Sequence, residues 1–328
     1  MHKMKKLLFL LSAAVAGVSV FADDWVYDPE TKYVSDGVWT FNATVNDTKG
    51  TIIFGRVVDD PALNVPVPTE LTEVDFSKPV HTADNSQSYV IAQLGNGMDI
   101  NQGGGVFGYL GAHQNDPQKT TVADFVGKVT LPGEGLEKIC DCAFYGCKNM
   151  SGTIHFPDSL TGIGKRTFEN VNNPDIVWEN LFPEKCTTFC KCAFMNSSLS
   201  GDLKISATSI PESTFRETRV TSAKFGPGTI KHSGAYNGGM FFHCTELTNV
   251  TFDAEMSGGV LAAGAAFDGC TKLEFLDLHG FSELGRRVGG YAADYPILSG
   301  SGVTKVLVSS NPLPSHRHTP DPSLGARR

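Results

Sequence analysis

A short phrase of small and polar residues around one phenylalanine returns at regular intervals along the middle of the chain. It reads Ala-Phe-Tyr-Gly-Cys at 143–147 and Ala-Phe-Asp-Gly-Cys at 266–270. The phenylalanines of this pattern, 21 to 26 residues apart, are Phe144, Phe168, Phe194, Phe215, Phe241 and Phe267. Such intervals are typical of solenoids, in which one repeat cannot bury its apolar side alone. The pattern predicts a stack of repeats whose phenylalanines form one continuous buried column.

A second pattern, between the phenylalanines, alternates apolar and polar residues. Thr-Ile-His-Phe at 153–156 and Asn-Val-Thr-Phe at 249–252 each place one polar residue between two apolar ones. A period of two is typical of a short strand with one buried face. Because the copies run in the same direction, with about 20 residues of return path, the strands are predicted to be parallel. The sequence thus predicts an α/β-type or mostly-β solenoid with one short parallel strand in each repeat.

The parts of a repeat also follow one another in a characteristic order. A Pro-x-Ser-Leu-Thr-x-Ile-Gly link occupies 157–164, and a Phe-x-Gly-Cys-x-x-Leu segment closes another repeat at 267–273. In these motifs the chain resembles the BspA-like leucine-rich repeat family, found on secreted and surface proteins of bacteria and some protists. The resemblance is clearest over residues 120–308, and an earlier strand is predicted at 70–76. It implies a leucine-rich repeat stack with a binding or adhesion role.

Residues 1–22 have the pattern of a cleaved secretory signal peptide. Three lysines in the first six residues precede an apolar run from Leu7 to Val20, and small residues follow at the expected cleavage site. The run is too short for a comfortable membrane span, so we expect a secreted, cell-surface or periplasmic protein whose mature chain is not inserted in a membrane. Removing three of the 27 basic residues leaves 24 against 35 acidic residues. This negative balance argues against nucleic acid as a partner.

Residues 23–68 lack the repeat and are predicted to form an N-terminal β-rich cap. Alternating segments at 38–45 and 51–58 predict a β-hairpin, which would cover the apolar end of the first repeat. The solenoid is assigned to residues 69–308. The Pro-rich residues 309–328 show no apolar periodicity and are predicted to be a disordered or truncated tail.

The sequence contains few residues or motifs that indicate catalysis. A carbohydrate-active parallel β-helix enzyme would need carboxylates on neighbouring repeats. Only one carboxylate occurs at the last exposed strand position, which runs Thr130, His155, Lys204, Lys224, Thr251 and Asp277. The glycine run at 103–108 formally fits a dinucleotide fingerprint, but it follows no apolar strand and is interpreted as a set of turn glycines. We expect no enzyme, no cofactor and no metal, with that enzyme class and a purely structural envelope scaffold as the alternatives. The histidines expected in turns or on the surface are His155, His232, His243 and His279.

The eight cysteines follow the repeat. Cys147, Cys244 and Cys270 each lie three residues after a phenylalanine of the pattern, where the resemblance implies a buried thiol. A ladder of buried thiols is favoured over disulfides and over a metal site. Equivalent residues of consecutive repeats are about 4.8 Å apart, within the reach of a disulfide. Cys244 and Cys270 are the only repeat-equivalent cysteines in consecutive repeats, so they are the candidate disulfide.

The outward-facing positions of the predicted strands form the candidate binding surface, which we call the strand face. In horseshoe solenoids such positions line an extended exposed sheet. Its predicted residues are Lys128, Thr130, Thr153, His155, Asp202, Lys204, Ser222, Lys224, Asn249, Thr251, Phe275 and Asp277. The expected partner is a protein or glycan ligand on another cell or in the envelope. An ordinary solvated sheet is the alternative interpretation.

Overall fold

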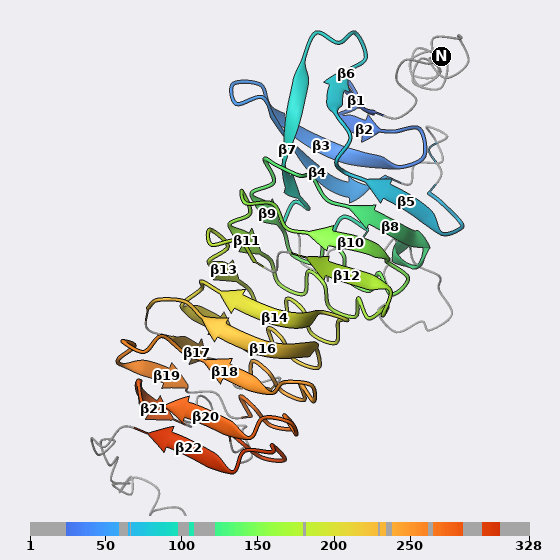
Figure 1. The fold of residues 1–328 in the computed structure, drawn as a ribbon. Helices are drawn as coiled ribbons and strands as arrows, with labels where there is room; N and C mark the ends of the chain where they lie inside the picture. Colours follow the sequence, from blue (N-terminus) through green and yellow to red (C-terminus); the bar gives the residue numbers. More distant parts are fainter. Residues whose placement is uncertain are drawn as a thin grey trace, which may run out of the picture.

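The computed structural model describes an elongated stack of short strands (Figure 1). The described residues are 24–58, 65, 67–97, 105–107, 122–179, 182–228, 230–233, 238–261, 265–284 and 297–308. The predicted signal peptide at 1–22 and the predicted tail at 309–328 lie outside them, as do three residues of the glycine run at 103–108. Within the described residues, no helix is long and apolar enough to cross a membrane.

The predicted strands, together with β12 (Ile176–Glu179), which the sequence did not predict, form a parallel ladder along one side of the stack, which we call the first ladder. Its strands are β5 (Thr72–Asp75), β8 (Val126–Thr130), β10 (Gly152–His155), β12 (Ile176–Glu179), β14 (Ser200–Ile205), β16 (Arg219–Phe225), β18 (Asn249–Thr251), β20 (Phe275–Leu278) and β22 (Lys305–Val308). Parallel pairs join β5 to β8, β10 to β12, β14 through β16 to β18, and β20 to β22. Ile154, Leu203 and Val250 are buried between exposed neighbours. The prediction of a mostly-β stack with a parallel strand in each repeat is confirmed.

A second ladder runs along another side of the stack, within the segments that the sequence presented as links. Its strands are β7 (Ser88–Leu94), β9 (Lys138–Ile139), β11 (Gly162–Ile163), β13 (Thr188–Phe189), β15 (Ser209–Pro211), β17 (Lys231–Ser233), β19 (Gly259–Leu261) and β21 (Phe281–Leu284). Parallel pairing runs from β7 through β9 and β11 to β13, and from β15 through β17 and β19 to β21. The repeats therefore contain two strands, one of which the sequence pattern did not reveal. A short 3-10 helix, Val122–Phe125, precedes β8.

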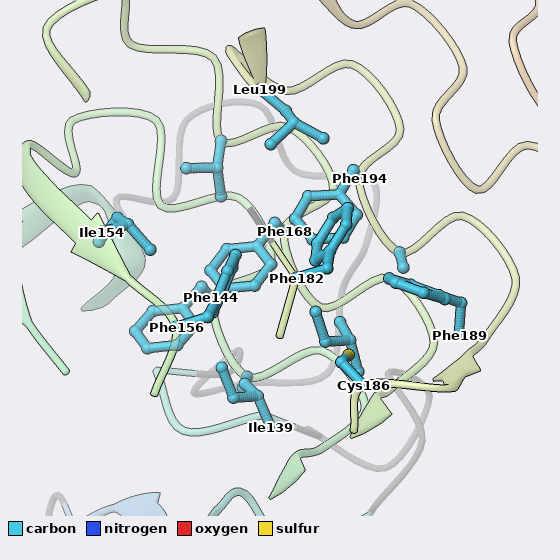
Figure 2. Close-up of a cluster of buried hydrophobic side chains, with 14 of the residues drawn as sticks. Ile139, Phe144, Ile154, Phe156, Phe168, Phe182, Cys186, Phe189, Phe194 and Leu199 are labelled. Carbon is cyan, nitrogen blue, oxygen red and sulfur yellow. The ribbon is translucent and has the colours of Figure 1, made fainter. Parts of the chain in front are cut away.

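The turn that closes each repeat carries its phenylalanine into the core (Figure 2). All six predicted side chains are fully buried. Neighbouring rings have centroids 5.2 to 6.0 Å apart and planes within 5° to 18° of parallel. The continuous column predicted from the sequence is confirmed, and Phe107 extends it at 5.7 Å from Phe144. We call these seven residues the phenylalanine column.

The residue two positions after each predicted phenylalanine explains part of the sequence pattern. Its backbone is left-handed in all six repeats, with φ between 52° and 72°, and the residues are Gly146, Asn170, Asn196, Glu217, His243 and Gly269. Glycine adopts this conformation at no steric cost, and asparagine visits it more readily than most other residues. The shape of the turn therefore favours the glycine or asparagine that often follows the phenylalanine.

The N-terminal strands form a cap that continues into the second ladder. The cap strands are β1 (Trp25–Asp28), β2 (Tyr33–Ser35), β3 (Thr40–Asn46), β4 (Thr51–Val57) and β6 (Val80–Thr82). The pairs within the cap are antiparallel except that of β1 with β6. The hairpin expected from the two alternating segments is β3 and β4, which pair antiparallel. Because β4 also pairs in parallel with β7, cap and second ladder share one nine-stranded sheet. The domain boundaries 23–68 and 69–308 stay predictions.

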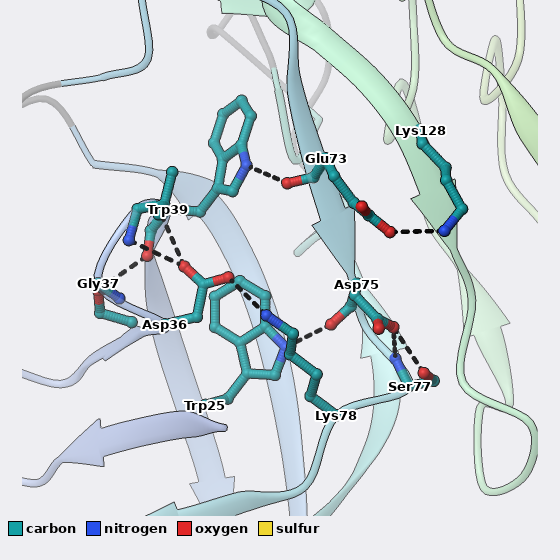
Figure 3. Close-up of polar contacts among 11 residues, drawn as sticks. Trp25, Asp36, Gly37, Trp39, Glu73, Asp75, Ser77, Lys78 and Lys128 are labelled. Atoms are coloured by element: carbon teal, nitrogen blue, oxygen red, sulfur yellow. Dashed lines mark hydrogen bonds and ion pairs between the residues drawn. The ribbon is translucent and has the colours of Figure 1, made fainter. Parts of the chain in front are cut away.

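Two tryptophans attach the cap to the first ladder (Figure 3). The indole N–H of Trp25 donates to the carbonyl of Asp75, and that of Trp39 donates to the carbonyl of Glu73, both at 2.8 Å. Both side chains are fully buried, so these bonds satisfy the one polar atom of each ring. Glu73 extends the junction through an ion pair with Lys128 at 2.8 Å.

Both ladders are interrupted at the same level of the stack. In the described part of the chain, strand pairing in the first ladder stops between β12 and β14 and between β18 and β20, and only the Lys128–Ser151 bridge joins β8 to β10. In the second ladder pairing stops between β13 and β15, so the level of β12 to β15 is where both ladders stop. The two blocks stay connected on the turn side, where the backbone N–H groups of Cys192, Phe194 and Asn196 donate to carbonyls of the next turn. The distance of 6.0 Å between the Phe194 and Phe215 centroids is the longest in the phenylalanine column.

Replacing Gly164 by alanine is expected to lower the free energy of unfolding by about 1 to 3 kcal/mol, the usual cost of overpacking. A Cβ at Gly164 would lie 2.4 Å from the backbone N of Asp141 and 2.5 Å from the carbonyl carbon of Cys140. These backbone atoms belong to the preceding repeat and can move away from the added Cβ only if the two repeats separate. Urea unfolding measures the change. Gly133→Ala is the control, because a Cβ at Gly133 meets no atom within 4 Å; equal stability of the two variants would contradict this packing.

Candidate functional site

All twelve residues predicted for the strand face lie on the first ladder or directly beside it. Nine of them are exposed, and the three that are half-buried are Thr130, Ser222 and Asp277. The pairing register aligns the outward side chains of neighbouring strands in two columns. Read from β14 to β18, the columns are Asp202, Ser222, Asn249 and Lys204, Lys224, Thr251. A role of these residues in binding stays a prediction.

Strand β12 adds one repeat to this surface that the sequence pattern did not reveal. It contributes Val177 and Glu179, both exposed. Glu179 is the register partner of His155. The strand reads Ile-Val-Trp-Glu, and its three consecutive apolar residues hide the alternation. Glu179 is therefore a second carboxylate in the column where Asp277 was the only one expected, although its partner on β10 is a histidine.

Several polar side chains of the strand face bind one another. Lys204 pairs with Glu184 at 2.9 Å. The Oδ1 atom of Asp202 accepts hydrogen bonds from the hydroxyls of Ser222 at 2.7 Å and Thr221 at 2.8 Å. These two bonds lower the pKa of the Asp202 carboxyl, with Ser222 contributing most. Exposed contacts of this kind contribute little to stability, so they do not by themselves explain why the residues are present.

Two lysines lie side by side in the middle of the strand face. Lys204 and Lys224 are direct register partners on β14 and β16. Lys224 is exposed, and within the described ranges no hydrogen bond or ion pair of its side chain is found. Like charges at directly opposite positions of a sheet are destabilising. Lys204 and Lys224 therefore form a small positively charged patch on the surface of a chain whose net charge is −8.

Before its last strand, β22, whose Val306, Leu307 and Val308 are all exposed, the first ladder has two large apolar side chains that point outward. Val177 on β12 is 52% exposed, and Phe275 on β20 is 41% exposed. Both occupy exposed positions of their strands, next to residues whose side chains are buried. The strand face thus offers apolar, positively charged and hydrogen-bonding groups on one continuous surface.

The repeat cysteines are buried thiols. All eight cysteines are free, and Cys147, Cys244 and Cys270 are fully buried. The thiol of Cys244 donates to the carbonyl of Phe215 at 3.0 Å, and that of Cys270 to the carbonyl of Phe241 at 3.1 Å. Burial raises the pKa of Cys244 to about 11, which keeps its sulfur protonated at neutral pH. The Cys244–Cys270 disulfide stays a prediction. No group of three metal-binding side chains occurs in the described ranges.

His232 was expected in a turn or on the surface, and this expectation is wrong. It lies on β17 at a core position, in register with Ile210 and Leu261, and is fully buried. Its Nδ1 donates to the carbonyl of Ile210 at 2.7 Å, and its Nε2 accepts from the backbone N–H of Met240 at 3.2 Å. Burial lowers the pKa of His232 to about 4, so the ring is neutral at pH 7. The other three histidines are exposed as expected: His155, His243 and His279.

Three solved structures are similar to this chain. A leucine-rich repeat protein from Bacteroides ovatus is 17% identical with a TM-score of 0.41, over 82% of this chain and 75% of that one. A leucine rich cell surface protein from Faecalibacterium prausnitzii is 11% identical with a TM-score of 0.27, over 84% and 94%. A T. pallidum leucine rich repeat protein is 16% identical with a TM-score of 0.34, over 71% and 87%.

No curated protein matches the chain in a sequence comparison. The family model described as BspA type leucine rich repeat region matches it in six copies, over residues 125–237 and 181–287. These residues contain all six phenylalanine turns predicted from the sequence and most of both parallel ladders. The chain therefore belongs to the BspA type leucine-rich repeat family.

Proposed function

We propose that this chain is an exported protein, secreted or held at the cell surface, that binds a partner protein through the strand face without catalysing a reaction. Membership of the leucine-rich repeat family supports a binding role, because stacked repeats present an extended surface to a partner. The signal-peptide pattern of residues 1–22 supports export.

The observation that carries the proposal is the lysine pair, Lys204 and Lys224. Two like charges in register cost stability. Glu184 already pairs with Lys204, so a partner that supplies a carboxylate or another anion to Lys224 would remove the rest of that cost. Val177 and Phe275 flank the pair along the ladder as exposed apolar groups. Aromatic side chains are enriched among the residues that dominate protein–protein affinity. An adhesion role would follow if the partner lies on another cell.

Charge reversal tests the proposal. Biotinylated protein captures partners from detergent-solubilised cell-surface proteins, and mass spectrometry then compares variants. Lys204→Glu/Lys224→Glu is expected to weaken capture of a specific partner at least about tenfold, since complementary charges at an interface become repulsive. The matched control is Lys138→Glu/Lys231→Glu, which changes the same charge at exposed lysines of the second ladder. A partner held equally by both double variants, or lost only with the control, would exclude the strand face.

A further inference from the structure

A hollow of about 150 Å³ lies at the C-terminal end of the strand face. It is formed by β18, by β20 and by the turns that follow these two strands. The polar and aromatic residues that line it are Asn249, Thr251, Phe252, Asp253, Phe275, Asp277 and His279. Four of these, all except Phe252, Asp253 and His279, belong to the predicted strand face. Two turns that the strand pattern does not include therefore complete a concave site.

The ring of Phe275 is an exposed aromatic surface at this site. Its side chain projects from β20, and the residue is 41% exposed. The ammonium group of Lys305, from the neighbouring strand β22, lies 5.6 Å from the ring centroid. Lys305 does not line the hollow. A cation is thus already accommodated at this ring in the free protein, in the geometry of a cation–π contact.

Each of the two carboxylates in the hollow has one oxygen atom available to a ligand. The Oδ1 atom of Asp277 accepts from the backbone N–H of His279 at 3.0 Å and from the ring Nδ1 of His279 at 2.6 Å. The Oδ1 atom of Asp253 accepts from the backbone N–H of Glu255 at 2.8 Å. Within the described ranges, no hydrogen bond of either Oδ2 atom is found. Each carboxylate is therefore held in place by one oxygen and can bind a ligand with the other.

His279 orients Asp277 and supports its ionisation. Burial acts to raise the pKa of Asp277, but the hydrogen bonds from the backbone and ring of His279 outweigh it, and the net effect lowers the pKa. The lining includes no lysine and no arginine. With two carboxylates and one histidine, the hollow is suited to a positively charged group rather than to an anion.

We propose that this hollow binds the side chain of a lysine or arginine from a protein partner, with the Phe275 ring against its charged group and Asp253 and Asp277 as its counter-charges. This proposal deepens the proposed function, because the hollow is part of the strand face. A metal ion is disfavoured, since the described residues contain no group of three metal-binding side chains. A neutral sugar would also stack on an aromatic ring, but it would leave the carboxylate charges unpaired.

The test is a titration with an acetylated, amidated tetra-arginine peptide. Met256 lines the hollow, so the 13C signal of its methyl group, assigned with Met256→Leu, reports binding there. A saturable shift is expected in the wild-type protein. Apparent affinity should fall at least about fivefold in Asp277→Asn and in Phe275→Ser, and binding should weaken as salt concentration rises. Asp158→Asn, the same charge change at an exposed turn residue outside the strand face, is the control and should leave affinity unchanged.

Three outcomes would overturn the proposal: no shift of the Met256 signal, equal effects of Asp277→Asn and Asp158→Asn, or a larger shift with tetra-glutamate, maltotetraose or calcium chloride. The titration uses no natural partner. The variant Lys204→Glu/Lys224→Glu should therefore bind the peptide at least as well as the wild type. The proposal for the hollow can therefore fail while the strand face still captures its partner. The proposal for the strand face can likewise fail while the peptide still binds.

Discussion

Replacing Phe168 by alanine is expected to lower the free energy of unfolding by about 3 to 5 kcal/mol, the usual cost of removing a packed aromatic side chain. Phe168 is fully buried, with ring centroids of Phe144 and Phe194 each 5.2 Å away. The change therefore removes contacts with the repeats before and after it. Urea unfolding monitored by circular dichroism gives the loss of stability.

Phe242→Ala is the matched control for this variant. Phe242 directly follows a member of the phenylalanine column but is half-buried, and its ring contacts are with His243 and the guanidinium of Arg216. The loss of stability should be clearly smaller. Because solenoid repeats couple mainly to their neighbours, hydrogen exchange in Phe168→Ala should accelerate first in β10 to β13. Equal losses for Phe168→Ala and Phe242→Ala would show that the column does not hold the stack together.

Acidification is expected to destabilise the protein through His232. The burial of this histidine lowers its pKa from 6.5 to about 4, so the unfolded chain takes up a proton at a pH where the folded chain does not. The contribution of the neutral ring to the free energy of unfolding is fully present above pH 6.5 and is lost as the pH falls to about 4. At about 1.4 kcal/mol for each pH unit, the total loss is about 3 kcal/mol.

A variant without a titrating ring isolates this effect from the carboxylates that titrate in the same range. His232→Gln keeps a polar group at the position but takes up no proton. The free energy of unfolding of the wild type, measured at intervals from pH 7 to pH 4, should fall more steeply than that of His232→Gln. Parallel curves would mean that His232 is not buried in its neutral form.

The sequence predicted those parts of the fold that involve large side chains at a regular spacing. Six members of the phenylalanine column, all except Phe107, were predictable because one bulky residue recurs every 21 to 26 positions. The first ladder was predictable because most of its strands alternate. The second ladder was not, since strands such as β9, β11 and β13 have only two residues each and cannot show a period. Its buried residues Ile139 and Ile163 each lie five positions before a phenylalanine of the column, which is the signal that would have revealed it.

The candidate site was predictable only in part, because a strand pattern says nothing about the turns beside it. Thr251, Phe275 and Asp277 follow from the alternation. Asp253 and His279 lie in turns after β18 and β20, and only the packing of two repeats brings them to the same hollow. His232 could not be placed correctly because its repeat lacks the Ile-Gly step that marks the core position in Pro157 to Gly164.

The interruption shared by the two ladders has a mechanical consequence. A stack whose repeats are hydrogen-bonded along only one side at a given level can bend about that side. Here that side is the row of backbone hydrogen bonds on the turn side between the Phe194 and Phe215 repeats, and strand pairing in both ladders stops at that level. Bending about this hinge changes the spacing between Val177 on β12 and Lys204 on β14. The curvature of the strand face is therefore expected to adapt most at the level where both ladders stop.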